Sequence, residues 1–301
     1  PASTASSMRE DDGLLTVRRH LRETESTNGS PHEARWLCEV APALDGAELD
    51  AAADEAVTTK MVAHLDEMVA RHRAGEPLAY VLGRWSFRHL DLAIDRRVLI
   101  PRPETEVVAG IAIELAASAE GPRVVADLGT GSGAIGLSLA SELPLRDTTV
   151  WLTDVSEEAL EVARANLAGI GRAAGNVSIA SGSWFDALPD GERFDVIVSN
   201  PPYVAVGSPD LDASVRDWEP ESALLAGVDG LDDIRVLVAG AVRHLRAGGW
   251  LVLEIGADQG RAVASLLDDA GYVDVEIRPD LAGRDRVAIA RPPVDDVTTA
   301  E

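Results

Sequence analysis

The sequence predicts an α/β fold, in which a largely parallel sheet lies between two layers of helices and a smaller helical region precedes it. Three observations support this prediction. From residue 121 onwards, short apolar runs alternate with helical patterns, which is typical of parallel sheets. Before the hairpin-like stretch described below, residues 9–84 show only helical periodicity. Between these two regions the apolar residues briefly alternate with polar ones, which is typical of a β-hairpin.

Composition places limits on the function. The chain of 301 residues is long enough for one large or two smaller domains, and no apolar run approaches the roughly 20 residues of a membrane helix. A formal net charge of −24 repels phosphate backbones, so nucleic acid is a poor first choice of partner. The one cysteine, Cys38, excludes an intrachain disulfide and suits a reducing cytoplasm; we expect it to be buried and inert.

The N-terminal region, residues 9–84, is expected to form a helical domain. No signal peptide precedes it, so residues 1–8 are expected to be a disordered tail or an added remnant, with Met8 as the native start. Ser30 is the expected N-cap of one helix, with Pro31 in its first turn and Glu33 reaching back to the cap. Apolar residues at helical spacing mark the core faces, and they are Leu14, Val17, Leu21, Leu37, Cys38, Ala41, Val57, Met61, Leu65, Met68 and Val69.

The rest of the chain is expected to alternate strands and helices after a β-hairpin linker at residues 85–100. Pro101-Arg102-Pro103-Glu104-Thr105-Glu106 leads into a helix from Val107 to about Ala117, where Glu104 and Glu106 would act as helix-dipole partners. Seven strands are expected at 124–128, 149–153, 177–180, 194–199, 250–255, 273–277 and 286–290. Four helices are expected among them at 134–142, 157–168, 232–245 and 259–270. The polar tail, residues 292–301, is expected to be disordered.

The stretch Ser199-Asn200-Pro201-Pro202-Tyr203 ends an apolar strand. Neither proline has an N–H, and each disfavours a helical conformation for the residue before it, so the chain must leave the sheet extended. Backbone acceptors are then left unpaired beside the flat ring of Tyr203. This cluster suits the binding of a planar NH2 group, although a proline-rich loop at a strand edge would have the same sequence pattern.

A glycine-rich loop, Asp127-Leu128-Gly129-Thr130-Gly131-Ser132-Gly133, closes one strand and opens a helix. Its glycines allow a tight turn and a close approach to a ligand, and free N–H groups at the helix start would meet an anionic group. Asp127 suits a ligand ammonium better than a phosphate, and a P-loop lysine is absent. Asp154 ends the next strand, where doubly wound folds place the acid that binds a ribose diol. These features describe S-adenosylmethionine better than a dinucleotide.

Together, the glycine loop and Asn200-Pro201-Pro202-Tyr203 resemble class I methyltransferases that act on an amide or exocyclic amino nitrogen. The flanking sequence resembles one family, PrmC/HemK, the peptide chain release factor N5-glutamine methyltransferases. The resemblance spans roughly residues 10–291, and Arg88-His89 departs from it, because relatives often have a glycine turn there. The flanking stretches are Glu76-Pro77-Leu78-Ala79-Tyr80-Val81-Leu82-Gly83, Leu99-Ile100-Pro101-Arg102-Pro103-Glu104-Thr105-Glu106, Glu219-Pro220-Glu221-Ser222-Ala223-Leu224 and Gly227-Val228-Asp229-Gly230-Leu231.

The resemblance implies a helical bundle, a hairpin linker and a Rossmann-like seven-stranded methyltransferase domain at residues 101–291. It implies methyl transfer from S-adenosylmethionine to the glutamine side-chain nitrogen of the Gly-Gly-Gln motif in class 1 release factors. Trp184 would lie over the adenine. The expected cofactor contacts, with Asp127 added from the charge argument, are Asp127, Gly129, Thr130, Gly131, Ser132, Gly133, Asp154, Trp184 and Asn200. The expected substrate contacts are Asn200, Pro201, Pro202 and Tyr203, of which Asn200, Pro201 and Tyr203 would be catalytic.

In the expected mechanism, the Asn200 side-chain oxygen and the Pro201 carbonyl accept from the substrate NH2 group, orient it and stabilise its developing positive charge. Tyr203 stacks on the amide plane. No general base is needed, because an alkylated amide readily loses its proton. Residues 204–232 would form a lid. The six histidines show no metal-ligand spacing, so no metal is expected. We expect a cytoplasmic monomer that contacts release factors through residues 9–84 and contacts no membrane or nucleic acid directly.

Three other functions remain open at this point. A glutamine methyltransferase for a ribosomal protein would be close in sequence. An adenine-N6 DNA methyltransferase uses the same Asn-Pro-Pro-Tyr motif but needs a basic groove and a target-recognition region. A non-catalytic module that binds S-adenosylmethionine would not need the intact stretch from Asn200 to Tyr203.

Overall fold

The computed structural model describes residues 24, 31–40, 50, 58–209 and 211–293. The chain divides into two compact units between Gly83 and Arg84. In its described part the first unit contains helices α2 (Pro31–Val40), α4 (Thr59–Arg73) and α5 (Leu78–Leu82). Its core is formed by Leu37, Cys38, Leu65, Met68 and Val81. Cys38 is therefore buried, as expected, and the expected helix marked by Leu14, Val17 and Leu21 and the expected cap Ser30 lie outside the described residues.

The second unit begins with a hairpin. Strands β1 (Arg84–Phe87) and β2 (Leu90–Ala93) pair antiparallel around Arg88 and His89. Arg88 has a φ of 51°, in the left-handed region that usually selects glycine. Its guanidinium binds both carboxylate oxygens of Glu142, with Nε 2.6 Å from Oε1. The turn therefore forms without glycine, because an ion pair to a distant helix holds the arginine.

The expected hairpin is shorter in the structure than in the sequence analysis. It ends at Ala93 and does not extend to Ile100. Asp95 explains this difference, because its side chain accepts the N–H of Arg97 and its carbonyl accepts the N–H of Val98. The chain therefore turns before a second half of the hairpin can form.

A seven-stranded sheet forms the centre of the second unit, in the order β5-β4-β3-β6-β7-β9-β8. Among the described strands of this sheet, β9 alone runs in the direction opposite to the other six. All seven expected strands are present. Their bounds are β3 (Arg123–Leu128), β4 (Thr148–Asp154), β5 (Val177–Ser181), β6 (Phe194–Ser199), β7 (Leu245–Glu254), β8 (Val273–Pro279) and β9 (Asp285–Arg291). Six of them begin and end within two residues of the expected bounds, whereas β7 begins at Leu245, five residues before its expected start.

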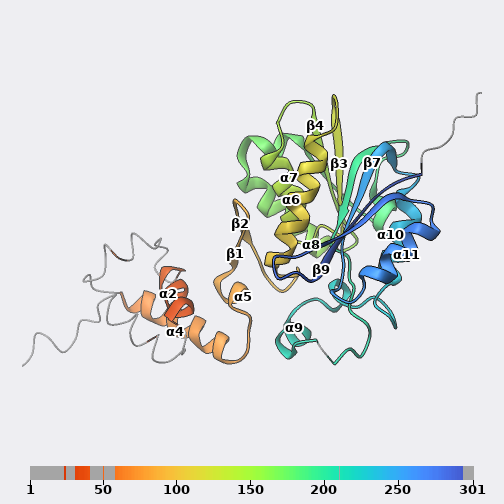
Figure 1. Ribbon diagram of the computed structural model, residues 1–301. Coiled ribbons are helices and arrows are strands. Elements are labelled where there is room, and N and C mark those ends of the chain that lie inside the picture. Colours follow the sequence, from red (N-terminus) through yellow and green to blue (C-terminus); the bar gives the residue numbers. More distant parts are fainter. Residues whose placement is uncertain (1–23, 25–30, 41–49, 51–57, 210, 294–301) are drawn as a thin grey trace, which may run out of the picture. The chain divides into compact units, whose positions relative to one another are not determined.

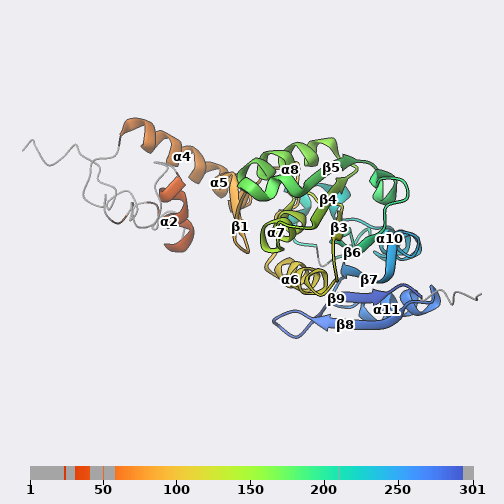
Figure 2. The same ribbon diagram turned by 90° about the horizontal axis from the view of Figure 1, so that it is seen from above.

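Helices cover both faces of this sheet (Figures 1 and 2). One face carries α6 (Pro103–Ala117), α7 (Ala134–Glu142) and α8 (Glu157–Gly169), and the other carries α10 (Asp232–Ala241) and α11 (Gly260–Asp269). Helix α10 ends earlier than the expected Leu245, because Leu245 already pairs with Phe194 as the start of β7. None of the helices in the described ranges is long and apolar enough to cross a membrane.

The strand order determines where a ligand can bind. Strand β3 lies between β4 and β6, so the chain order reverses at β3. In open α/β sheets, ligands bind outside the carboxyl ends of the strands at such a reversal. The glycine loop follows β3, Asp154 ends β4 and Asn200 follows β6. Parallel pairing therefore brings all three predicted site segments to the same edge of the sheet.

Candidate active site

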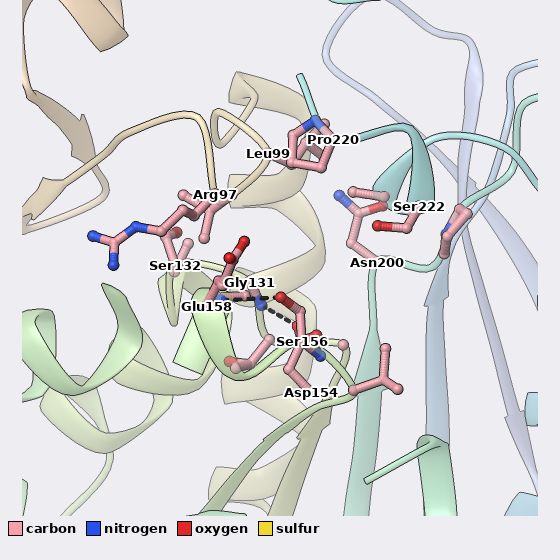
Figure 3. Close-up of a pocket in the computed structure, with 18 of the residues that line it drawn as sticks. Arg97, Leu99, Gly131, Ser132, Asp154, Ser156, Glu158, Asn200, Pro220 and Ser222 are labelled. Carbon is pink, nitrogen blue, oxygen red and sulfur yellow. Dashed lines mark hydrogen bonds between the residues drawn. The ribbon is translucent and has the colours of Figure 1, made fainter. Parts of the chain in front are cut away.

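A cavity of about 390 Å³ lies at the carboxyl ends of β3, β4 and β6. This volume falls within the roughly 300–1,000 Å³ that is typical of small-molecule sites. Its wall includes residues 96–99 and 101, the glycine loop from Gly129 to Ser132, the end of β4, and residues that follow β5 and β6. Figure 3 shows Gly131, Asp154 and Ser156 together on one side and Asn200, Pro220 and Ser222 on the other.

Asp154 is held on the cavity wall by backbone N–H groups. Its Oδ2 accepts from Gly131 and its Oδ1 from Ser156, both at 2.9 Å (Figure 3). Burial raises the pKa of Asp154, while these N–H groups oppose that shift. Each carboxylate oxygen can accept more than one hydrogen bond. The orientation of the side chain is therefore fixed, and accepting capacity remains for hydroxyl groups of a ligand.

The glycine loop is preformed by its own hydrogen bonds. Gly129, Gly131 and Gly133 have φ values of 70°, 55° and 86°, in the region that favours glycine. The N–H of Thr130 donates to Thr153, and that of Gly133 donates to Thr130. Fewer N–H groups than expected are therefore free for a ligand. Gly133 does not line the cavity, whereas Gly129, Thr130, Gly131 and Ser132 do.

Asp127 lies behind the loop rather than on the cavity wall. Its side chain is buried, and its Oδ2 accepts from the Thr130 hydroxyl at 2.6 Å and from the Gly136 N–H at 2.8 Å. Burial raises the pKa of Asp127 to about 6. Its Oδ1 has no hydrogen-bond partner among the described residues. Asp127 therefore holds the loop in place and keeps one acceptor of the kind that an ammonium group satisfies.

Trp184 places a flat ring against the glycine loop. It begins the short helix η2 (Trp184–Ala187) with a φ of 47°, an unusual value for a bulky residue. Its indole hydrogen-bonds the half-buried Asp233, and burial raises the pKa of that carboxyl. A Cβ at Gly129 would lie 3.2 Å from the ring. The absence of a side chain at Gly129 therefore lets the ring approach the loop.

Asn200 and Pro202 line the cavity, but Pro201 and Tyr203 do not. The Asn200 Nδ2 donates to the Thr105 hydroxyl at 3.3 Å. Pro201 is buried, and the half-buried Tyr203 donates its hydroxyl to Glu254 at 3.2 Å. The sequence-predicted substrate contacts therefore separate into two residues at the cavity and two immediately behind its wall.

The segment from Val204 to Asp232, expected to form a lid, has its own structure in its described part. It contains α9 (Ala213–Trp218) and the short helix η3 (Glu221–Ala223). Glu219 binds the Arg102 guanidinium and accepts the Ile100 N–H at 3.1 Å. The Arg96 guanidinium lies 4.0 Å from the centre of the Trp218 ring. These contacts join the segment to the loop before α6, and Pro220, Ser222 and Ala223 line the cavity.

Several functional candidates were missed by the sequence analysis. Thr105 and Asp233 line the cavity, and Glu254 lies behind it. Thr105 and Asp233 lie in the first turns of helices, where polar residues are common, and Glu254 lies in a strand. No local sequence pattern therefore marks these three residues as functional. One sequence signal could have indicated Thr105, because it lies in the stretch Pro101-Arg102-Pro103-Glu104-Thr105-Glu106 that carries the family resemblance. Among the described residues, no group of three or more His, Cys, Asp and Glu could hold a metal ion.

Two protein families match the sequence in separate segments. The methyltransferase small domain matches residues 113–216, and the PrmC N-terminal domain matches residues 14–83. The first match covers the glycine loop, Asp154 and Asn200. The second match ends at Gly83, the last residue of the first compact unit.

Two relatives that cover most of the chain are both named release factor glutamine methyltransferase. A release factor glutamine methyltransferase from Xylella fastidiosa strain Temecula1 is 49% identical over 226 residues, 75% of this chain and 80% of that protein. Its counterpart from Vibrio cholerae is 41% identical over 278 residues, 92% of this chain and 95% of that protein. A methyltransferase structure from Pyrococcus furiosus matches 76% of this chain and 100% of its own with a TM-score of 0.51. At 21% identity, that likeness concerns the fold alone.

Proposed function

The chain belongs to the release factor glutamine methyltransferases, and we propose that it methylates the glutamine side-chain nitrogen of the Gly-Gly-Gln motif in class 1 release factors. One observation carries this proposal for the site itself. Asn200 follows β6 at the cavity, and its NH2 group donates a hydrogen bond to the Thr105 hydroxyl. The side-chain oxygen of Asn200 therefore remains as the acceptor for a substrate NH2 group.

We propose S-adenosylmethionine as the cofactor, which when bound supplies an activated methyl group. The volume of the cavity and its donor set fit this molecule. Asp154 would accept from the ribose hydroxyls, and Trp184 would pack on the adenine. The loop from Gly129 to Ser132 would hold the amino-acid part, and Asp127 would support that loop from behind through its hydrogen bonds to Thr130 and Gly136. The missing side chain at Gly129 supports this arrangement, because it lets the Trp184 ring lie directly against the loop.

The chemistry follows from the weakness of an amide as a nucleophile, since its nitrogen lone pair is delocalised. Asn200 would accept from the glutamine NH2 group, hold it in line for attack and stabilise the positive charge that develops. The Pro201 carbonyl is the proposed second acceptor and Tyr203 the proposed flat wall, both on the basis of the family resemblance. No His or Cys is among the described cavity residues, and none is needed, because the alkylated amide loses its proton afterwards.

We further propose that the protein acts as a cytoplasmic monomer and that its helical N-terminal region, residues 9–84, recognises the body of the release factor. The methyltransferase domain would span residues 101–291, with the hairpin region as linker. A glutamine on a short loop offers little surface for affinity, so specificity requires contacts elsewhere on the release factor. The net charge of −24 supports a protein substrate over nucleic acid.

Mass spectrometry of a class 1 release factor, incubated with the protein and S-adenosylmethionine, tests the proposal. We expect one added methyl group, located on the glutamine of the Gly-Gly-Gln motif. A release factor with that glutamine changed to alanine is the matched control and should gain no mass. Methylation of ribosomal proteins or of DNA, with the release factor left unmodified, would contradict the proposal.

A further inference from the structure

The polar residues of the stretch 101–106 bind different parts of the second unit. Three of them bind partners outside the cavity lining: Arg102 binds the Glu219 carboxylate, Glu104 binds Arg284, and Glu106 accepts the N–H of Arg88. The two glutamates thus have specific partners beyond the expected helix dipole. Thr105 differs from the other three, because it is buried and lines the cavity. Its contacts suggest a role in the reaction.

The Thr105 hydroxyl connects a buried carboxylate to Asn200. Its Oγ1 donates to the Glu254 Oε2 at 2.7 Å and accepts from the Asn200 Nδ2 at 3.3 Å. A hydroxyl carries a single proton. Because Glu254 accepts that proton, Thr105 presents only lone pairs to Asn200. The amide of Asn200 must then turn its NH2 group to Thr105 and its oxygen away from Thr105.

The charged form of Glu254 can only accept hydrogen bonds, and its surroundings supply the donors. It ends β7 and is 1% exposed. Its Oε1 accepts from the Tyr203 hydroxyl at 3.2 Å, and that hydroxyl in turn accepts from Arg286 at 3.4 Å. Both oxygens of Glu254 therefore receive hydrogen bonds, and a guanidinium lies close behind one of them. A buried carboxylate is costly without such partners.

We propose that Glu254 is a positioning residue that fixes the direction of the Asn200 amide through the Thr105 hydroxyl. This inference rests on the proposed function and extends it to the selection of the substrate. A correctly turned Asn200 offers an acceptor to the substrate NH2 group. A flipped Asn200 would offer its own NH2 group, so two donors would face each other. The Glu254–Thr105 pair thereby makes the site specific for a nitrogen that carries hydrogens.

Kinetics of Thr105 variants test the inference. In Thr105→Val the hydroxyl is lost at nearly constant volume, and we expect kcat on the release factor to fall roughly 10- to 100-fold with unchanged cofactor affinity. Thr105→Ser keeps the hydroxyl and should remain within about threefold of wild type. Thr148→Val is the matched control, because Thr148 is also buried and its hydroxyl donates to Pro144, outside the cavity lining. It should leave kcat unchanged.

A double-mutant cycle separates positioning from general stability. Glu254→Gln can offer Thr105 either an oxygen or an NH2 group, so we expect kcat to fall about tenfold. If Glu254 acts through Thr105, the double variant should be no slower than Thr105→Val alone. Additive losses, or a Thr105→Val variant within twofold of wild type, would overturn the inference. If Thr105→Val does not fold, Thr105→Ser and Glu254→Gln still decide the outcome.

A readout independent of turnover distinguishes this inference from the proposed function. Hydrogen exchange of the Asn200 side-chain NH2 group, assigned in NMR spectra by its loss in Asn200→Asp, should be slow in the wild type. It should be faster in Thr105→Val and Glu254→Gln. Equal exchange in all three proteins would overturn the inference even if the release factor is methylated. A wild type that leaves the release factor unmethylated would overturn the proposed function, and the exchange pattern would still decide this inference.

Discussion

The two sides of the cavity are built in different ways. On the β4 side, Asp154 is fixed by N–H groups from residues 23 and 2 positions away. On the β6 side, Asn200 is fixed by Thr105, 95 positions away, and Thr105 by Glu254, 149 positions away. A local arrangement can be inferred from a motif, whereas a distant one depends on the complete fold. The first side holds the proposed cofactor and the second the proposed substrate, so substitutions on the two sides should have separable effects.

Substitution of Asn200 should have the strongest effect and should act on turnover. Asn200→Ala removes the preorganised acceptor, and the loss of one such partner typically lowers the rate about 10²–10³-fold. We expect kcat to fall by this amount while the affinity for S-adenosylmethionine stays within a few-fold. Steady-state kinetics and calorimetric titration measure the two quantities, with circular dichroism as the check on folding. A variant with near-normal kcat would remove Asn200 from the chemistry.

The buried carboxylate behind Asn200 should make stability depend on pH. Burial raises the pKa of Glu254 from 4.5 to about 7. Between these values the folded protein binds more protons than the unfolded chain, so the Glu254 contribution to stability decreases as the pH rises. Glu254→Gln does not titrate. Relative to wild type, it should therefore gain about 3 kcal/mol in unfolding free energy between pH 4 and pH 8.5.

Urea denaturation at several pH values measures this difference. A difference between wild type and Glu254→Gln that is constant with pH would show that Glu254 keeps an ordinary pKa in the fold. The groups that face Glu254 also affect its titration: Arg286 favours its charged form, and Glu104 disfavours it. Arg286→Met removes the group that favours the charged form of Glu254. This substitution should therefore raise the Glu254 pKa further and move the pH-dependent loss of stability to higher pH.

Substitution on the β4 side should instead change cofactor affinity. A hydrogen bond to a charged group contributes roughly 1.5–3 kcal/mol, so Asp154→Ala should weaken S-adenosylmethionine binding about 10- to 150-fold. The matched control is Glu157→Ala, which removes an exposed carboxylate three residues away that binds Arg164. Calorimetric titration should show no change for the control. Equal affinity of Asp154→Ala and wild type would exclude Asp154 from the ribose contact.

The smallest effect is expected at the hairpin, outside both sides of the cavity. Arg88→Ala and Arg88→Gly both lose the ion pair with Glu142, but only glycine adopts the φ of 51° without strain. Arg88→Gly should therefore be more stable than Arg88→Ala by about 1 kcal/mol or more. Urea denaturation measures the difference. Indistinguishable stabilities would mean that the positive φ costs alanine nothing measurable, and that the ion pair alone explains why arginine occupies this turn.

The same local–distant contrast explains how far the sequence could predict the structure. The strands were predicted because each is an apolar run bounded by polar or glycine residues. The end of α10 was misplaced because Leu245 pairs with Phe194, a partner that no local pattern reveals. Asp154 was predicted because it ends the strand that follows the glycine loop. Glu254 was missed because, unlike Asp154, it does not end the strand that follows the glycine loop. Its role depends on Thr105 and Tyr203, which only the fold brings next to it.

The most direct test compares single-turnover methylation of a release factor by Asp154→Ala and Asn200→Ala at saturating S-adenosylmethionine. Saturation compensates for weakened cofactor binding but not for a lost transition-state contact. We therefore predict that Asp154→Ala recovers to within a few-fold of the wild-type rate, while Asn200→Ala remains about 10²–10³-fold slower. Equal losses in the two variants, or recovery of Asn200→Ala, would contradict the division of the site into a cofactor side and a substrate side.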